Sequence, residues 1–239
     1  MPVTGVQTCA LPICINIDGT LNVLVAARDA KVKRVVFAAS SSAYGETPTL
    51  PKTEDMPPMP ISPYGVTKYV GELYAQTFGR CFGLENVCLR YFNIFGPRQD
   101  PSSPYSGVMA KFCTAFLEET EPVIFGDGTQ SRDFTYVDNA VQANLLACEA
   151  PNASGKVFNV VTGHRISLND IVACLGKVSG KPLAPRYDLP RDGDIRDSQA
   201  DITRARQYLG YEPTVQFGEG LERTFEWYRA SQTKPVSKP

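Results

Sequence analysis

The chain has 239 residues, of which 43% are hydrophobic and 21% charged, so it exceeds one typical domain and can bury a sizeable core. Its net charge of −1 argues against nucleic acid or an anionic membrane as the main partner, and no apolar run reaches the roughly 18 residues of a membrane helix. Seven cysteines without paired spacing and one histidine fit neither a disulfide framework nor a zinc site, which favours a reducing, cytoplasmic location without a metal.

Residues 1–14 do not resemble the rest of the chain. They have no basic segment ahead of an apolar one, so we do not expect a secretory signal. The string from Val3 to Ile13 resembles a translated sequencing adapter. We therefore expect that residues 1–14 are a non-native leader and that the protein's own sequence begins near Ile15.

A helix and a strand are predicted next. Apolar residues recur at helical spacing over residues 17–30, which predicts a helix packed on a sheet. The apolar run 35–39 predicts a buried parallel strand. Ser40, Ser41 and Ser42 follow it directly, at the carboxyl edge where open α/β sheets bind their ligands.

A second helix is predicted after a Pro-rich loop at residues 45–62. Ser62 suits its N-cap and Pro63 its first turn. Tyr64 and Lys68 are four residues apart and would share one face of this helix. Six further residues recur at helical spacing: Tyr69, Val70, Leu73, Tyr74, Thr77 and Phe78.

Serine, tyrosine and lysine together indicate proton transfer coupled to hydride transfer. A phenol with an ordinary pKa of about 10 is a poor base near neutral pH, and a nearby ammonium favours the phenolate. Tyr64 would then accept a proton from a substrate hydroxyl while Ser40 hydrogen-bonds the same oxygen. The sequence does not choose between Ser40, Ser41 and Ser42 for this hydroxyl.

The second half of the chain alternates predicted strands and helices. Asn93 follows the first of these strands, at its carboxyl end. The turn at 126–128 lacks GxGxxG spacing and opens no helix, so we expect a turn or hairpin there and no phosphate loop. The predicted strands are 85–91, 123–126, 132–137 and 157–161. The predicted helices are 107–119, 138–150 with Asp138 as its cap, one capped by Ser167, 201–209 and 217–231.

Four further motifs accompany the Ser–Tyr–Lys pattern: LRYFNIFGPRQ at 89–99, GDGTQSRDF at 126–134, YVD at 136–138 and FNV at 158–160. With them, residues 15–228 resemble the extended short-chain dehydrogenase/reductase family of NAD-dependent epimerases and dehydratases, specifically the 4-epimerases of UDP-hexoses. The resemblance implies an α/β fold, with the C-terminal part of a doubly wound Rossmann-like parallel sheet and a smaller α/β substrate-binding lobe. It implies a partial dinucleotide-binding domain at 15–98, a mainly substrate-binding lobe at 99–232 and a tail at 233–239. Some segments of the lobe would return to the first domain.

The resemblance also implies roles for individual residues. The cofactor would be NAD, the substrate a UDP-sugar and the assembly a homodimer. Ser40, Tyr64 and Lys68 would be catalytic, and Tyr64 and Lys68 would also bind NAD. The expected substrate-binding residues are Ser41, Asn93, Val108, Arg132, Arg196 and Thr203, of which the two arginines would hold the diphosphate through their guanidinium forks.

One part of the expected cofactor site is missing from the sequence. A dinucleotide-binding fold needs a Gly-rich turn at a helix N-terminus, and the chain contains neither GxGxxG nor GxxGxxG. By resemblance, this turn would lie upstream of Ile15. We therefore expect that the chain is a fragment, inactive by itself, of an intact 4-epimerase. The family's helix at 17–30 also carries an asparagine near the cofactor; Asn16 or Asn22 would match it, and we assign neither a role.

Two alternative functions stay open: a dehydratase or decarboxylase of the same family, and a non-catalytic binding protein. Dehydratases carry an Asp–Glu pair just after the serine position, where this chain has Ser41 and Ser42. For the substrate, the resemblance places a size-selecting residue seven positions after Arg196, at Thr203. A small residue there admits N-acetyl sugars, which predicts that UDP-N-acetylglucosamine is the better substrate.

Overall fold

The computed structural model describes residues 14–103, 107–190 and 195–232. The predicted leader, apart from Cys14, and the predicted tail lie outside these ranges. The described chain forms two compact units. The first unit includes residues up to Phe92, Ala140–Gly163 and Ala200–Glu212, and the second includes Asn93–Asn139, His164–Gln199 and the residues from Pro213.

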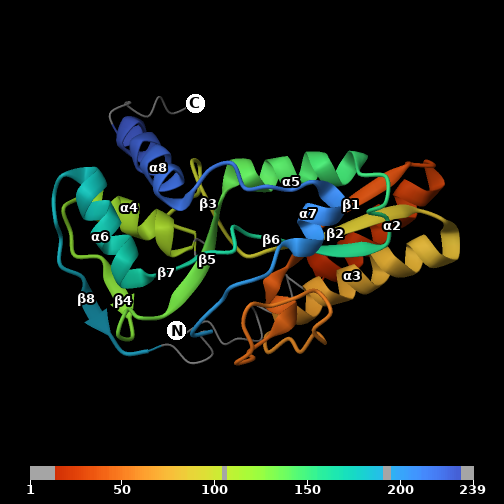
Figure 1. The fold of residues 1–239 in the computed structure, drawn as a ribbon, viewed down its shortest axis with the longest axis horizontal. Helices are drawn as coiled ribbons and strands as arrows, with labels where there is room; N and C mark the ends of the chain where they lie inside the picture. Colours follow the sequence, from red (N-terminus) through yellow and green to blue (C-terminus); the bar gives the residue numbers. More distant parts are fainter. Residues whose placement is uncertain (1–13, 104–106, 191–194, 233–239) are drawn as a thin grey trace. The chain divides into compact units, whose positions relative to one another are not determined.

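The first unit is built on a parallel sheet with the order β1-β2-β6 (Figure 1). Its strands are β1 (Arg34–Ser40), β2 (Glu85–Tyr91) and β6 (Lys156–Val160). Its helical segments are the π-helix η1 (Cys14–Asp18), α2 (Gly19–Asp29), the 3₁₀ turn η2 (Ser41–Tyr44), α3 (Pro63–Phe82), most of α5 (Val137–Glu149) and α7 (Thr203–Leu209). The predicted parallel strands and Rossmann-like α/β fold are confirmed.

Helices cover both faces of this sheet. On one face of β2, Val87 and Leu89 pack with residues of α5 and α7. On the other face, Cys88 packs with Ala75 of α3. The alternation follows from the two-residue period of a strand. Because Ser40 pairs with Tyr91 and Tyr91 with Val160, the carboxyl ends of the three strands form one edge of the sheet, and the serines begin there.

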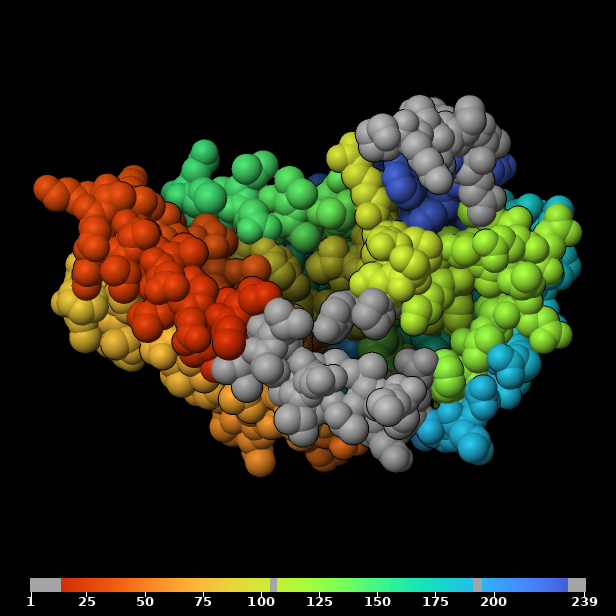
Figure 2. Space-filling model, turned by 180° about the vertical axis from the view of Figure 1, so that it is seen from behind, coloured from red at the N-terminus to blue at the C-terminus, as the bar shows by residue number. Residues whose placement is uncertain are grey.

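The burial predicted for the strand at 35–39 is found only in part, since Ala39 is buried. Val35, Val36 and Phe37 are only partly buried, and Ala38 is exposed. Within the described residues β1 pairs with β2 on one side and with no strand on the other. An edge position therefore explains the exposure. The surface of this part of the unit, including α2, is seen in red and orange in Figure 2.

The helix α3 begins as the sequence predicts. Ser62 is its N-cap and accepts a hydrogen bond from the main-chain N–H of Gly65 at 3.1 Å, and Pro63 is the first helical residue. The packed face differs from the predicted apolar positions, because Leu73 and Thr77 are exposed. The buried residues of α3 are mostly small: Gly65, Thr67, Gly71, Glu72, Ala75 and Phe78.

Small residues are required where α3 crosses β1. A Cβ atom on Gly71 would lie 2.2 Å from the ring of Phe37, and such a contact cannot form. The helix therefore approaches the strand more closely than a face of large apolar residues would allow. This close approach brings the first turns of α3 to the edge of the sheet.

The described residues of the second unit form two small sheets. In one, β5 (Ser131–Tyr136) pairs parallel with β3 (Asn93–Phe95) and antiparallel with β7 (Arg165–Ser167), and in the other β4 (Val123–Phe125) pairs parallel with β8 (Arg186–Asp188). The helices are α4 (Val108–Leu117), α6 (Leu168–Ser179) and α8 (Phe217–Gln232). Its core includes Phe95, Met109, Phe112, Phe116, Ile171, Leu175 and Phe225.

Two local predictions in the second unit are confirmed and one is wrong. Ser167 caps α6 and accepts from the N–H of Asp170 at 3.1 Å. The segment 126–128 is a turn with positive φ at Gly126 and Gly128. It is not a hairpin, because β4 and β5 pair with different strands. Asp138 does not precede its helix, since α5 begins at Val137 and Asp138 lies in the first turn.

No helix in the described ranges combines the length and the apolar character needed to cross a membrane.

Candidate active site

The serine turn lies at the carboxyl end of β1. Ser40 is the last residue of the strand, and its hydroxyl oxygen accepts hydrogen bonds from the N–H of Ser42 at 3.2 Å and from the hydroxyl of Ser42 at 2.8 Å. A serine hydroxyl has two lone pairs and one proton, so both lone pairs of Ser40 are used and its proton is available to a further acceptor. Ser40 can therefore donate to a further oxygen, whereas the Ser42 hydroxyl already donates to Ser40.

Tyr64 and Lys68 lie on α3 beside this edge. Tyr64 is 46% exposed, and the Lys68 ammonium lies 5.9 Å from the centre of the Tyr64 ring. Lys68 also donates to the main-chain carbonyl of Ala38 on β1, at 3.1 Å. Burial lowers the pKa of Lys68. The predicted spacing thus places a cation next to a phenol at the sheet edge.

The serine turn and α3 are in direct contact. A Cβ atom on Gly65 would lie 2.7 Å from the carbonyl oxygen of Ser42, so the residue after Tyr64 touches the turn. Asn16 of η1 adds a hydrogen bond from its amide to the Thr67 hydroxyl at 3.0 Å, and this hydroxyl donates to the carbonyl of Tyr64 at 2.8 Å. From the sequence Asn16 has no assigned role, because an exposed polar helix face explains it equally well. Its hydrogen-bond partner is 51 residues away, so no local pattern indicates this contact.

Three predicted substrate residues come together in the second unit. The Asn93 amide donates to the carbonyl of Asp133 and to the hydroxyl of Ser198, both at 3.4 Å. Arg132 donates to the main-chain carbonyl of Arg196 at 2.7 Å. The segment 196–198 therefore connects Asn93 with both arginines, and it includes Ser198, which the sequence reasoning missed.

Asp197 fastens this segment to β5. Its carboxylate accepts from the N–H of Ser131 at 3.2 Å and from the Ser131 hydroxyl, and it lies 3.7 Å from the guanidinium of Arg165. The hydrogen bond from the Ser131 hydroxyl, more than the nearby arginines, holds the pKa of Asp197 below its ordinary value. Asp197 therefore stays ionised and keeps Arg196 and Ser198 in place.

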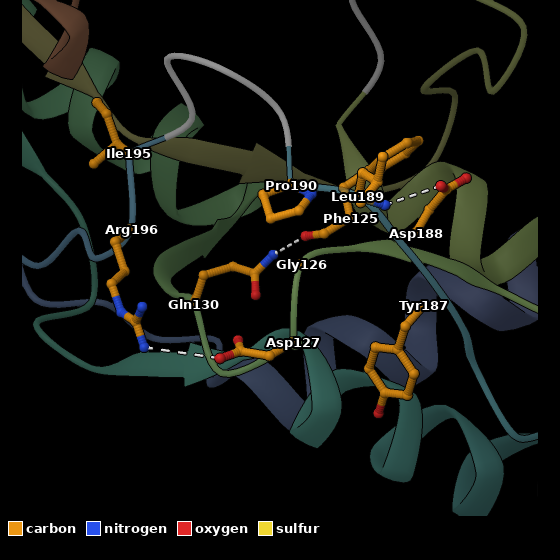
Figure 3. Close-up of a pocket in the computed structure, with 10 residues that line it drawn as sticks. All are labelled: Phe125, Gly126, Asp127, Gln130, Tyr187, Asp188, Leu189, Pro190, Ile195 and Arg196. Carbon is orange, nitrogen blue, oxygen red and sulfur yellow. Dashed lines mark hydrogen bonds and ion pairs between the residues drawn. The ribbon is translucent and has the colours of Figure 1, made fainter.

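A cavity of about 460 Å³ opens beside Arg196 in the second unit (Figure 3). The Arg196 side chain is 71% exposed, donates to the Thr129 hydroxyl at 3.2 Å and lies 3.9 Å from the carboxylate of Asp127. Gln130 donates to the carbonyl of Phe125 at 2.6 Å. Aromatic, amide and charged groups thus line one hollow, which suits a polar ligand with a planar ring.

Three predicted substrate residues lie elsewhere, and the first of them, Ser41, begins the 3₁₀ turn η2 in the first unit. Val108 is the first residue of α4 and lines a second cavity of about 460 Å³ together with Phe125. Thr203 belongs to the first unit and is the first residue of α7, where its N–H and hydroxyl donate to the carboxylate of Asp201 at 2.8 and 3.0 Å. In the described structure Thr203 hydrogen-bonds none of the other predicted site residues, whereas Ser198 bonds Asn93.

The described residues contain no group of three His, Cys, Asp or Glu side chains that could hold a metal ion.

Residues 9–161 match the family model of the NAD dependent epimerase/dehydratase family. The chain belongs to this family.

Members of the epimerase/dehydratase family are similar along most of the chain. A putative UDP-glucose 4-epimerase of Methanocaldococcus jannaschii is 39% identical over 90% of this chain and 69% of its own length. UDP-glucose 4-epimerase from Thermotoga maritima, solved with UDP-glucose, matches with a TM-score of 0.91 and 41% identity, over 95% of this chain and 73% of its own. UDP-N-acetylglucosamine 4-epimerase from Methanobrevibacter ruminantium, solved with UDP-N-acetylmuramic acid, matches with a TM-score of 0.90 and 37% identity. The match covers 96% of this chain and 74% of the solved chain.

Proposed function

We propose that this protein, expressed from its complete reading frame, is an NAD-dependent 4-epimerase of UDP-hexoses. The observation that carries the proposal is the arrangement of Ser40, Tyr64 and Lys68 at one edge of the parallel sheet. The similarity to UDP-sugar 4-epimerases supports it.

The described residues fit one end of NAD. The exposed phenol of Tyr64 and the ammonium of Lys68 lie at the carboxyl edge of β1 and would hold the nicotinamide ribose through its hydroxyl groups. The sequence contains no Gly-rich turn for the pyrophosphate. We propose that residues upstream of Ile15 supply this turn. When bound, NAD supplies a hydride acceptor that returns the hydride within the same turnover.

The residues of the chain would handle the proton at the C4 hydroxyl of the sugar. Ser40 donates its free proton to the C4 oxygen and holds it in place. Tyr64, as a phenolate, accepts the hydroxyl proton while the C4 carbon is oxidised to a 4-keto group, and Tyr64 returns the proton when the opposite face is reduced. The Lys68 ammonium, oriented by the Ala38 carbonyl, stabilises the phenolate.

The second unit would bind the UDP part. Arg132 and Arg196 would neutralise the diphosphate, and Asn93 would donate its amide to a substrate oxygen. The cavity beside Arg196 would accept the ring of the uridine against Phe125. For this, Arg196 must exchange its contacts with Thr129 and Asp127 for the phosphate oxygens.

We also propose a homodimer and a cytoplasmic location. The helices α2 and α3 pack side by side, and Val23, Val66 and Leu73 on these helices are exposed. An apolar surface of this kind suits a second copy of the chain. Light scattering during gel filtration measures the mass directly, and a monomer at micromolar concentration would exclude the dimer.

The test of the function is the product. The protein and NAD⁺ are incubated with UDP-glucose, UDP-N-acetylglucosamine or UDP-glucuronate in separate reactions, and the products are identified by NMR. The 4-epimer is the expected product. A keto-deoxy sugar would point to a dehydratase, and carbon dioxide from a UDP-glucuronate substrate would point to a decarboxylase. No turnover of any of these sugars would leave the non-catalytic binding protein as the better description.

A further inference from the structure

A buried ion pair connects α3 with the sheet beneath it. Arg90 of β2 donates to the carboxylate of Glu72 twice, from Nε at 2.8 Å and from Nη2 at 2.7 Å. The two side chains are 3% and 1% exposed. Glu72 lies four residues after Lys68, so it is the next residue along the same side of the helix. The pair therefore holds the helix that carries Tyr64 and Lys68.

Arg90 also contacts the serine turn. Its guanidinium lies 4.5 Å from the ring centre of Tyr44, the last residue of η2. The Tyr44 hydroxyl donates to the side-chain oxygen of Asn159 on β6 at 2.7 Å. Burial raises the pKa of Tyr44 to about 12, so this hydroxyl keeps its proton as a donor. One guanidinium thus connects α3, through Glu72, with the end of the serine turn, through Tyr44.

Stability alone does not account for this pair. Removing two charges from water costs about as much as their attraction returns, and apolar residues of similar size are often as stable or more stable. The Nη1 group of Arg90 is buried and has no hydrogen-bond partner, which adds to the cost. The small residues Gly65, Gly71 and Ala75 on the packed face of α3 offer few side chains that could stop the helix from sliding.

We propose that Arg90 is a positioning residue of the active site. Through the two-pronged bond to Glu72 and the contact with Tyr44, it sets the distance and angle between α3 and the serine turn, so that Ser40 and Tyr64 reach the same substrate oxygen. The catalytic part of this inference rests on the proposed epimerase function.

The test replaces the whole pair, so that no unpaired buried charge is left. The double variant Glu72→Met with Arg90→Met is compared with the double variant Arg34→Met with Glu85→Met. This control pair joins β1 to β2 at the amino ends of the two strands. In the control, Arg34 Nε lies 2.9 Å from Glu85 Oε2, and the Arg34 side chain is 8% exposed. All proteins are expressed from the complete reading frame. Hydrogen exchange is measured at the N–H groups of Ser42 and Gly65, which bond to the hydroxyls of Ser40 and Ser62.

We expect faster exchange at Ser42 and Gly65 in the network variant and unchanged exchange in the control. We also expect kcat to fall about 10²-fold with KM for the UDP-sugar unchanged, because misplaced reacting groups slow chemistry while the diphosphate contacts lie in the other unit. Exchange or kcat equal to that of the control would overturn the positioning role. If the unaltered protein epimerises no sugar, the proposed function fails, and the exchange rates alone decide whether Arg90 orders the two segments.

A second variant covers the case in which the double variant does not fold. Arg90→Lys keeps the charge and loses the two-pronged geometry. We expect it to fold and to show the same changes to a smaller degree, with kcat lowered and KM retained. Native exchange at Ser42 and Gly65 together with native kcat in Arg90→Lys would overturn the proposal.

Discussion

Lys68 on α3 donates a hydrogen bond to the main-chain carbonyl of Ala38 on β1, at 3.1 Å. This bond fixes the ammonium at the carboxyl edge of the sheet, one helical turn from Tyr64. The carbonyl takes one of three ammonium protons, so the others stay available for a phenolate and for ribose hydroxyls. The strand thereby orients a cation that the helix alone would leave flexible.

Tyr64→Phe removes the proposed proton acceptor and keeps the ring. We expect kcat for UDP-sugar epimerisation to fall by roughly 10²–10⁴, the usual scale of general acid–base catalysis, with UDP-sugar binding little changed. Tyr69→Phe, on the same helix, is the matched control and should retain its turnover. Steady-state kinetics with calorimetric binding measure both quantities, and near-normal turnover in Tyr64→Phe would refute the role of the phenol.

Lys68→Met tests the cation. Because burial lowers the pKa of Lys68, its ammonium is lost at a lower pH than that of an exposed lysine, and catalysis should decline on the alkaline side as the phenolate loses its partner. Lys68→Met should raise the apparent pKa of the acidic limb of the pH–rate profile and weaken NAD binding. A full pH–kcat profile and NAD titration check this, and a variant with both properties unaltered would contradict the assignment.

Gly65→Ala tests the contact between α3 and the serine turn. The added Cβ atom would lie 2.7 Å from the Ser42 carbonyl oxygen, so the turn or the helix must move. We expect a loss of about 1–3 kcal/mol in unfolding free energy, as for other overpacked sites, together with lower kcat. Gly218→Ala in α8 meets no atom within 4 Å and should not destabilise the protein. Equal urea denaturation curves for the two variants would show that the contact is not tight.

Glu54→Gln tests a buried carboxylate in the Pro-rich loop. Burial raises the pKa of Glu54 above its ordinary 4.5, although its oxygen accepts from the N–H of Asn159 at 2.9 Å. A raised carboxyl pKa means that stability is greatest below the unfolded pKa and declines as pH rises through the folded pKa. The Gln variant should therefore match the parent at pH 4 and have a higher Tm at pH 8. The control is Glu149→Gln, because Glu149 is exposed. A Glu54→Gln variant that is less stable than the parent protein at pH 8 would show that the charge of Glu54 stabilises the fold.

Two substitutions, Thr203→Tyr and Ser198→Tyr, test which residue selects the substrate by the size of its sugar. The resemblance names Thr203, and in the structure Ser198 accepts a hydrogen bond from Asn93, a proposed substrate-binding residue. If the resemblance is correct, Thr203→Tyr should depress kcat/KM for UDP-N-acetylglucosamine about tenfold or more relative to UDP-glucose, because a bulky ring excludes the acetamido group. The same selective loss in Ser198→Tyr alone would transfer the role to Ser198. No selective loss in either variant would remove both residues from sugar selection.

The sequence by itself determined the local elements of this protein. The Ser62 cap with Pro63, the Ser167 cap and the strand 85–91 were predicted as the structure has them. Caps and helical or strand periods depend on residues within about four positions of each other, and these are adjacent in the sequence. The one-face spacing of Tyr64 and Lys68 follows from the same local geometry.

Only the tertiary structure decided which faces and partners these elements have. The amide of Asn16 bonds Thr67 at a separation of 51 residues, and that of Asn93 bonds Ser198 at a separation of 105. Neither bond has a local signal, because it depends on how distant segments pack. The burial of Glu72 is a further case: a glutamate on a helix normally points to solvent, and the Arg90 guanidinium from the neighbouring strand makes the buried position possible.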